Sequence, residues 1–507
     1  MTALDLSSPV AVVGTGTMGQ GIAQVALVAG HPVRLYDAAP GFAKTAAAAI
    51  TARLDRLVEK GRVDAAARDA AAGRLRAVES LAELAGCELV VEAVLEQLDV
   101  KQRLFQDLEE VVGDGCLLAT NTSSLSVTAV GGALKHPGRF VGLHFFNPAP
   151  LLPLVEVVSG FATDETAATR AYDTAKAWGK TPVRCADTPG FIVNRIARPF
   201  YAEALRVHEE RAADPATIDA VLRECGGFRM GPFELTDLIG QDVNEAVTRS
   251  VWESFFQDPK FTPSLAQRRL VESRRLGRKS GQGWYAYGDG AEKAEPHTAE
   301  PATAPRSVTL HGELFQAAAL IPLIEAAGVR VERGQPGDSG HPDFPGWIEL
   351  PGGTRLALAD GSFPDTAAQP TIQFDLALDY GTATRIALAP AARVGQEALG
   401  SAVGLFQALG KRVSVVRATP GMIVARTVAM LVDFAHDAVA RGVADADDID
   451  TAMRLGVNYP RGPLSWGADL GLYWVTEALD HLHDEYPTGR YAASQGLRAA
   501  AAKEDHA

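Results

Sequence analysis

The sequence predicts an α/β domain followed by an all-helical domain, with this pair of domains repeated in degenerate form. Apolar, strand-like runs alternate with helical patterns up to about residue 183, which is typical of a parallel sheet covered by helices. Helical patterns alone then continue to about residue 275. Short motifs of this first half recur in the second half at fixed offsets, which predicts an internal duplication.

Length and charge limit the possible functions. A chain of 507 residues, 47% of them apolar, is long enough for about three ordinary domains. The net charge of -14 argues against nucleic acids and anionic membranes as partners. Residues 1–9 lack the features of a signal peptide, and no apolar run reaches the roughly 18 residues of a membrane span. We therefore expect a cytoplasmic protein that binds neither nucleic acid nor membrane.

The first strand-like run, at residues 10–13, ends in a glycine-rich turn that opens a helical pattern. Gly14 and Gly16 let the backbone turn and approach a pyrophosphate, and Gly19 lets the helix pack closely on the strand. The N–H groups at the start of that helix then face the phosphates. A structural turn that binds no phosphate is the alternative, because a bare GxGxxG pattern is weak evidence.

An acidic residue strengthens the nucleotide interpretation. A second strand-like run ends in Asp37, 23 positions after Gly14, where a carboxylate meets the ribose hydroxyls of a dinucleotide. No arginine follows in residues 38–40, so the sequence favours NAD over NADP. We therefore predict a Rossmann-type NAD-binding domain. Its predicted cofactor contacts are Gly14, Gly16, Thr17, Met18, Gly19 and Asp37.

A histidine and a glutamate interrupt two apolar runs further along the chain. His144 lies in residues 142–148 (GLHFFNP), and Glu156 lies in the middle of residues 154–158 (LVEVV). An unpaired buried carboxylate would be costly, so Glu156 needs a partner, and His144 is the nearest titratable candidate on a neighbouring strand. A carboxylate on one ring nitrogen stabilises the imidazolium that forms when the other nitrogen takes a proton. The pair predicts a general base, and a histidine satisfied within the core is the alternative.

Other polar residues follow the ends of predicted strands. Glu96 follows the run at residues 88–94, Ser123 follows the run at 116–120, and Asn147 follows His144. The carboxyl ends of parallel strands meet at one edge of a sheet, where ligands bind. We therefore expect these side chains to face one crevice.

Six motifs, taken in order, resemble those of the L-3-hydroxyacyl-CoA dehydrogenase family. They are GTGTMGQG at 14–21, VVEA at 90–93, NTSSL at 121–125, GLHFFNP at 142–148, DTPGFIVNR at 187–195 and GRKSGQGWY at 277–285. The resemblance covers roughly residues 8–288. It implies an NAD-dependent enzyme that oxidises an L-3-hydroxyacyl-CoA to the 3-oxoacyl-CoA.

The same resemblance implies roles for individual residues. The catalytic pair of the family matches His144 and Glu156. The residues that bind substrate around its reacting carbon match Ser123, Asn147 and Asn194. The acid and the lysine near its nicotinamide match Glu96 and Lys101, with Ser123 also among the cofactor contacts. Lys60 falls where a contact to a coenzyme A phosphate is expected.

The second half repeats the plan of the first half. Residues 308–332 follow residues 10–34 at an offset of 298, and after a deletion an offset of 231 carries residues 188–190 (TPG) to 419–421. The polar residues do not recur. The changes are Gly16 to Leu314, Gly19 to Ala317, Asp37 to Gln335, His144 to Asp375, Asn147 to Leu378, Glu156 to Ala387 and Asn194 to Ala425. We expect one active site per chain, with the second half as a built-in partner in a pseudo-dimer that can associate further into a homo-oligomer.

The predicted organisation has five segments. They are an NAD-binding domain at 1–186, a helical domain for substrate and packing at 187–288, a linker at 289–306, a degenerate Rossmann-like domain at 307–417 and a second helical domain at 418–507. This two-copy arrangement, with MRLGVNYPRGP at 453–463, resembles family members of phenylacetate catabolism and implies 3-hydroxyadipyl-CoA as substrate. The alternatives are a 3-hydroxybutyryl-CoA or fatty-acid β-oxidation dehydrogenase, a dehydrogenase of small hydroxy acids without CoA, and an NAD-binding structural or regulatory protein.

Overall fold

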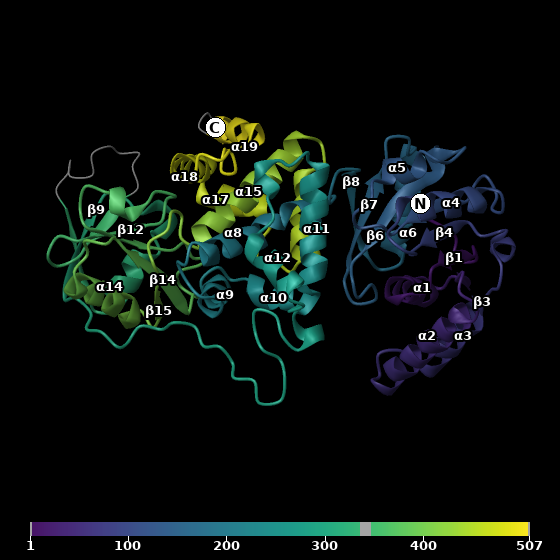
Figure 1. The fold of residues 1–507 in the computed structure, drawn as a ribbon, viewed down its shortest axis with the longest axis horizontal. Coiled ribbons are helices and arrows are strands. Elements are labelled where there is room, and N and C mark those ends of the chain that lie inside the picture. Colours follow the sequence, from purple (N-terminus) through teal and green to yellow (C-terminus); the bar gives the residue numbers. More distant parts are fainter. Residues whose placement is uncertain (1–2, 335–345, 505–507) are drawn as a thin grey trace. The chain divides into compact units, whose positions relative to one another are not determined.

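The protein, seen as a computed structural model, is described over residues 3–334 and 346–504 and forms two compact units. Unit 1 comprises the described residues up to 195 together with residues 441–457. Unit 2 comprises residues 196–440 and the described residues from 458 onward. The chain therefore passes from unit 1 to unit 2, returns once, and ends in unit 2 (Figure 1).

Unit 1 is built on an eight-stranded sheet in the order β3-β2-β1-β4-β5-β6-β7-β8. Its strands are Val10–Val13 (β1), Val33–Tyr36 (β2), Leu75–Ala77 (β3), Leu89–Glu92 (β4), Leu117–Thr120 (β5), Phe140–Phe145 (β6), Leu154–Ser159 (β7) and Thr181–Ala186 (β8). Neighbouring strands run parallel except β6 and β7, which run antiparallel. The prediction of a wholly parallel sheet is therefore wrong at β7. Only residues 146–153 join the two strands, fewer than the about a dozen residues that a parallel crossover needs.

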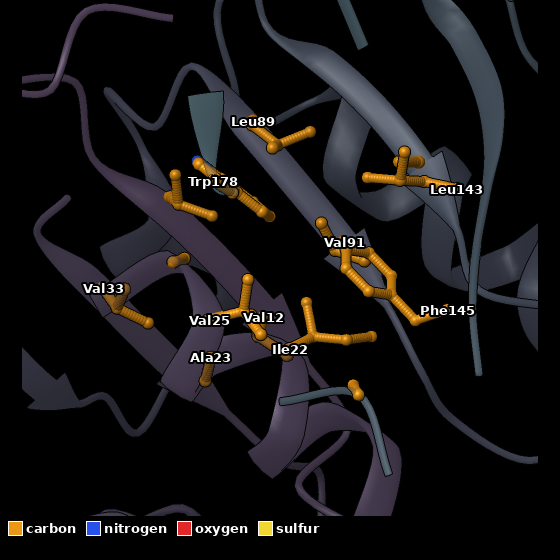
Figure 2. Packing of buried hydrophobic residues seen from close by; sticks show 14 of the residues in the cluster. Val12, Ile22, Ala23, Val25, Val33, Leu89, Val91, Leu143, Phe145 and Trp178 are labelled. Carbon is orange, nitrogen blue, oxygen red and sulfur yellow. The ribbon is translucent and has the colours of Figure 1, made fainter. Parts of the chain in front are cut away.

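Helices cover this sheet. They are Thr17–Ala29 (α1), Phe42–Glu59 (α2), Ala65–Arg74 (α3), Leu98–Glu109 (α4), Val127–Gly131 (α5), Glu165–Ala177 (α6) and Ala446–Gly456 (α16). Figure 2 shows the core between the sheet and α1, where Val12, Val91 and Leu143 of three strands meet Ile22 and Trp178. Burial of such side chains supplies about 25 cal/mol per Å² of apolar area, which holds the carboxyl ends of these strands in place.

Unit 2 contains a second sheet, with seven strands among the described residues, in the order β10-β9-β11-β12-β13-β14-β15. The strands are Ser307–His311 (β9), Arg330–Arg333 (β10), Trp347–Glu349 (β11), Arg355–Leu358 (β12), Thr371–Phe374 (β13), Arg385–Pro390 (β14) and Arg412–Val415 (β15). As in the first sheet, the first two strands of the repeat pair in parallel and a glycine with positive φ follows the first of them, Gly312 here and Gly14 there. A second, reduced α/β sheet is therefore confirmed.

Unit 2 also contains the remaining helices of eight or more residues together with the shorter α13. They are Arg198–Glu209 (α8), Pro215–Glu224 (α9), Pro232–Ile239 (α10), Gln241–Ser254 (α11), Leu265–Glu272 (α12), Leu320–Ala326 (α13), Gln396–Ala408 (α14), Val424–Ala440 (α15), Pro463–Leu470 (α17), Leu472–Glu485 (α18) and Gln495–Glu504 (α19). Helix α15 packs on α8, α17, α18 and α19, as Figure 1 shows at the centre of the ribbon. The helical segment that follows residue 191 is divided into two helices, α7 (Val193–Ile196) and α8, because Pro199 cannot continue the backbone hydrogen-bond ladder.

Three consecutive helices of the first half have counterparts at a constant offset in the second half. Helices α9, α10 and α11 begin 231 residues before α16, α17 and α18 respectively. Each of the two sheets also carries a helix from the opposite half of the chain, because α16 packs on β7 and β8 whereas α9 packs on β14. Matching backbone bonds accompany this exchange. Ala186 N donates to Val443 O in unit 1, and Arg417 N donates to Ala212 O in unit 2.

Two further predictions meet the structure here. The predicted linker at residues 289–306 forms no helix or strand, and Ala299 N donates to Val413 O of β15. Gln335, the predicted counterpart of Asp37, lies outside the described residues. No helix of the described part of the chain is long and apolar enough to cross a membrane.

Candidate active site

His144 and Glu156 face each other on the antiparallel strands β6 and β7. They are directly opposite in the register, and His144 Nδ1 lies 2.6 Å from Glu156 Oε2. Both side chains are buried, with 6% of His144 and none of Glu156 exposed. The predicted partnership on neighbouring strands is therefore confirmed, although it depends on the antiparallel pairing that the sequence did not predict.

Glu156 has a second task. Its Oε1 accepts hydrogen bonds from the backbone N–H groups of Ile192 and Val193, at 3.1 and 2.9 Å, where α7 begins. These N–H groups have no partner within their own helix, so the carboxylate completes both the helix end and the imidazole contact. The carboxylate is thereby fixed from both sides. Asn194, the next residue of α7, is held beside it.

Two aromatic rings restrict the imidazole. The ring centroid of Phe146 lies 4.5 Å from that of His144, and the centroid of Phe191 lies 5.7 Å away. When Nδ1–H donates to Glu156, the other nitrogen, Nε2, carries the lone pair that can accept a proton. The arrangement can therefore act as a general base at one defined atom.

A buried ion-pair network lies at the carboxyl ends of β4 and β5. Glu92 is fully buried and accepts from Lys101 Nζ at 2.5 Å and from Thr120 Oγ1 at 2.7 Å. Lys101 also lies 3.2 Å from Glu96. Lys101 is itself 1% exposed, so it reaches any ligand through Glu96 rather than directly.

Glu96 organises the loop that carries Ser123. Its Oε1 accepts from Thr122 Oγ1 at 2.6 Å and from the backbone N of Ser123 and Ser124 at 3.0 and 3.1 Å. Burial opposes ionisation, but Lys101 and these hydrogen bonds outweigh it and lower the pKa of Glu96. Glu96 is therefore an anion that positions Ser123.

The three predicted substrate contacts differ in setting. Ser123 follows β5 and Asn194 lies on α7, and both are half-buried. Asn147 is exposed in the turn after β6. One contributor escaped sequence reasoning: Asn121 Oδ1 accepts from Phe145 N at 2.9 Å and so ties the end of β5 to the residue after His144. Its position as the first residue of the NTSSL motif could have identified Asn121 from the sequence.

The glycine turn fits a dinucleotide. A Cβ on Gly14, where φ is +91°, would lie 2.5 Å from Ala93 O, and one on Gly19 would lie 1.8 Å from Gly14 O. A Cβ on Gly16 would meet nothing within 4 Å, so that side of the turn is open. Helix α1 begins at Thr17 without a side-chain cap, which leaves its N–H groups available to phosphate oxygens.

Asp37 ends β2 beside this turn. Its Oδ2 accepts from Thr15 N and Thr15 Oγ1, at 2.9 and 2.7 Å. Partial burial opposes ionisation, but the hydrogen bonds from Ala39 and Thr15 prevail and lower the pKa of Asp37. The site therefore presents a fixed negative charge next to the nucleotide-binding turn.

We expect this charge to exclude NADP. Two unit charges about 4 Å apart near a surface repel by up to ~4 kcal/mol, and about a third of that gives a tenfold preference. kcat/KM for NAD should therefore exceed that for NADP by at least about tenfold. Measuring both values for the wild type and for Asp37→Asn checks this, because the variant should have a smaller ratio of kcat/KM for NAD to kcat/KM for NADP. Equal values in the wild type would show that Asp37 does not face the 2′-phosphate.

The predicted coenzyme A contact is accessible. Lys60 is exposed at the end of α2, and within the described residues its side chain makes no hydrogen bond or ion pair. Arg53 of the same helix is half-buried, and its Nη2 donates to Gln20 Oε1 at 3.0 Å. Gln20 Nε2 in turn donates to Thr15 O. Arg53 thus supports the glycine turn from α2.

The second sheet has an aspartate at the position of His144. Asp375 occupies the position that His144 has in the first sheet, and its carboxylate accepts from the backbone N of Ile423, Val424 and Ala425 at the start of α15. These N–H groups correspond to those that Glu156 binds. Burial raises the pKa of Asp375 to about 6 although these N–H groups favour its charge. The N–H groups at the start of α15 thus have a carboxylate partner, and no imidazole is present at this position.

The described residues contain no group of three or more His, Cys, Asp or Glu side chains that could hold a metal ion.

Comparisons with protein families cover most of the chain. The model "3-hydroxyacyl-CoA dehydrogenase, NAD binding domain" matches residues 9–188. The model "3-hydroxyacyl-CoA dehydrogenase, C-terminal domain" matches two segments, 190–287 and 421–506. A "3-hydroxybutyryl-CoA dehydrogenase reduced Rossmann-fold domain" matches residues 356–420, within the second sheet.

Individual relatives agree with this assignment. The chain is 44% identical over 495 residues to the 3-hydroxyadipyl-CoA dehydrogenase of Escherichia coli, with 98% of each chain covered. It is 40% identical to a 3-hydroxybutyryl-CoA dehydrogenase of Mycobacterium tuberculosis, over 56% of this chain and 99% of that one. The crystal structure of 3-hydroxybutyryl-CoA dehydrogenase from Escherichia coli K12 matches with a TM-score of 0.89 at 41% identity, covering 99% of this chain and 100% of that one. The chain therefore belongs to the 3-hydroxyacyl-CoA dehydrogenase family and is an NAD-dependent oxidoreductase of 3-hydroxyacyl-CoA thioesters.

Proposed function

We propose that His144 is the general base of this oxidation and that 3-hydroxyadipyl-CoA is its preferred substrate. The observation that carries the first part is the buried 2.6 Å contact between His144 Nδ1 and Glu156 Oε2. It leaves Nε2 as the proton acceptor at the end of β6, beside the strand ends that carry Glu96 and Ser123.

Each residue then has a defined task. NAD, when bound at the glycine turn, supplies the hydride acceptor for C3 of the substrate. His144 Nε2 takes the proton of the C3 hydroxyl as the carbonyl forms, and Glu156 stabilises the resulting imidazolium. Ser123, Asn147 and Asn194 orient the substrate oxygens, with Ser123 held by Glu96. Lys60 contacts a phosphate of coenzyme A.

The substrate assignment rests on similarity along the whole chain. The Escherichia coli relative named for 3-hydroxyadipyl-CoA matches both halves, whereas the Mycobacterium tuberculosis relative named for 3-hydroxybutyryl-CoA matches 56% of this chain. 3-Hydroxybutyryl-CoA is the second candidate, because the solved structure that matches the full chain is named for it. A place in phenylacetate catabolism and a cytoplasmic location remain predictions from the sequence.

NADH formation distinguishes these candidates. We expect kcat/KM with 3-hydroxyadipyl-CoA to exceed that with 3-hydroxybutyryl-CoA by at least about tenfold, which corresponds to about 1.4 kcal/mol of binding energy. Free 3-hydroxy acids serve as the control for recognition of CoA. A higher value with 3-hydroxybutyryl-CoA would reverse the substrate order, and turnover of free acids alone would remove the CoA thioester from the proposal.

We also infer that the second half is a degenerate copy that serves as a built-in partner. The equal helix offsets and the reciprocal placement of α9 and α16 support it, because an isologous interface relates each contact to its counterpart. Asp375 in place of the imidazole supports a single active site.

The number of bound cofactors tests this inference. Calorimetric titration should find one NAD per chain, because Leu314 and Ala317 replace two glycines of the binding turn and the second sheet lacks their open approach. A stoichiometry of two would show that the second half binds a nucleotide of its own.

A further inference from the structure

Arg198 carries a buried charge that no carboxylate of the described residues neutralises. It lies at the start of α8 and is 5% exposed. Its Nη1 donates to the neutral Thr248 Oγ1 at 3.0 Å, its guanidinium lies 5.0 Å from the ring centroid of Tyr201, and its Nε has no hydrogen-bond partner. Burial lowers the pKa of Arg198, because removing the charged guanidinium from water is unfavourable.

Other buried arginines of unit 2 have glutamate partners. Arg385 lies 2.8 Å from Glu224, Arg426 lies 2.8 Å from Glu203, and Arg490 lies 2.5 Å from the same carboxylate. Within the described residues, Arg198 makes no such ion pair. A buried cation without an anion is costly, so its retention calls for a ligand that supplies the missing charge.

A cavity lies beside this guanidinium. Its volume is about 220 Å³, more than ten times the roughly 15 Å³ that one water needs. It is lined along α8 by Arg198, Tyr201 and Arg206, and from the opposite side by Thr248, Ser264 and Gln267. All of these residues belong to unit 2.

Three neutral side chains of the cavity already have hydrogen-bond partners. Thr248 Oγ1 donates to Asn244 O, Ser264 Oγ donates to Glu209, and Gln267 Nε2 donates to Gln241 and Asn244.

The cations of the cavity are the unsatisfied groups. Arg206 is half-buried, its guanidinium makes no hydrogen bond or ion pair in the described part of the chain, and burial lowers the pKa of this group. The nearby Glu203 already binds Arg426 and Arg490. The one acidic residue lining the cavity, Glu209, is exposed and accepts from Ser264 and Ala266. The cavity therefore favours an anion.

We propose that this cavity is a carboxylate-binding subsite centred on Arg198. A guanidinium with a free edge binds a carboxylate through two parallel hydrogen bonds. Two sources can supply such a group: the terminal carboxylate of a dicarboxylic acyl chain, which rests on the proposed function, and a free small carboxylate. The tests below distinguish them.

The first test compares two substrates. Arg198→Met keeps the length and apolar stem of the side chain but removes its charge. If the acyl chain supplies the carboxylate, kcat/KM with 3-hydroxyadipyl-CoA should fall by about 10- to 100-fold, because hydrogen bonds to a charged group contribute about 1.5–3 kcal/mol. The value with 3-hydroxybutyryl-CoA, which has no terminal carboxylate, should change less than about threefold. Arg268→Met, an exposed arginine of α12, is the matched control and should alter neither value.

The second test needs no turnover. Calorimetric titration of the NAD-saturated full chain with adipate should detect binding to the wild type and to Arg268→Met, and not to Arg198→Met. If adipate binds as expected but Arg198→Met leaves the ratio of kcat/KM for the two thioesters unchanged, the ligand of this subsite is a free carboxylate. If the wild type oxidises neither thioester, the proposed function fails while adipate binding still decides the subsite. An equal loss with both substrates, or adipate binding that Arg198→Met leaves intact, would overturn the subsite.

Discussion

His144→Ala is expected to lower kcat by at least about 10², with little change in the dissociation constant of NAD. The imidazole is the group whose free nitrogen can take the hydroxyl proton, while the glycine turn that binds NAD lies on other strands. Glu156→Gln should lose a similar factor for a more specific reason. The glutamine Oε1 can still accept from Ile192 and Val193, so its NH₂ group must face His144 Nδ1. That donor forces the proton onto Nε2, which leaves no base toward the substrate.

Single-turnover NADH formation, with NAD affinity measured separately, checks both variants. Asp375→Asn is the matched control, because Asp375 occupies the position of His144 in the second sheet and should leave kcat unchanged. Turnover of His144→Ala within about threefold of the wild type would remove the base assignment. A loss in Glu156→Gln that stems only from unfolding would appear as a lower melting temperature, which separates the two explanations.

Glu203→Gln is expected to destabilise unit 2 by about 3–5 kcal/mol, the usual cost of breaking a buried charge network. Glu203 lies on α8 and is fully buried. Its Oε1 accepts from Arg490 Nε at 2.9 Å, and its Oε2 accepts from Arg426 Nε at 2.8 Å and from Tyr491 Oη at 2.7 Å. The substitution removes the negative charge that Arg426 and Arg490 share, and both arginines are buried. The network ties α8 of the first half to α15 and to residues near the C-terminus.

The same carboxylate makes stability depend on pH. Burial opposes ionisation, but Arg490 and Arg426 outweigh it and lower the pKa of Glu203 from 4.5 to about 2. A lowered pKa means that the folded state holds the ionised form more tightly than the unfolded state does. The contribution of Glu203 is therefore complete above about pH 4.5 and is lost as the pH falls toward 2.

Thermal unfolding between pH 7 and pH 3 measures this contribution. The wild type should lose stability across the acid range, while Glu203→Gln starts lower and changes less. Glu272→Gln, which removes one exposed partner of Arg268, is the control and should cost less than about 0.5 kcal/mol. Equal melting temperatures for Glu203→Gln and the wild type at pH 7 would show that the network does not stabilise the fold.

The sequence by itself determined the elements whose signals are local. The glycine turn at Gly14 to Gly19 follows from backbone sterics, since a Cβ at Gly14 or Gly19 would collide with neighbouring backbone atoms. The reduced second half follows from comparing the chain with itself, and the helix starts keep the offset of 231. The His144–Glu156 pair was predictable because a carboxylate in the middle of an apolar strand requires a partner.

Only the tertiary structure decided which groups share each site. The two N–H groups that Glu156 binds and the exchange of α9 and α16 between the sheets join residues far apart in sequence. The antiparallel direction of β7 places Glu156 directly opposite His144. Arg198 shows the difference most clearly. In the sequence it is one more arginine in a helix, and its meaning depends on burial and on the absence of a carboxylate around it within the described residues. Electrostatic cost is set by the surroundings of a charge, and those surroundings exist only once the chain has folded.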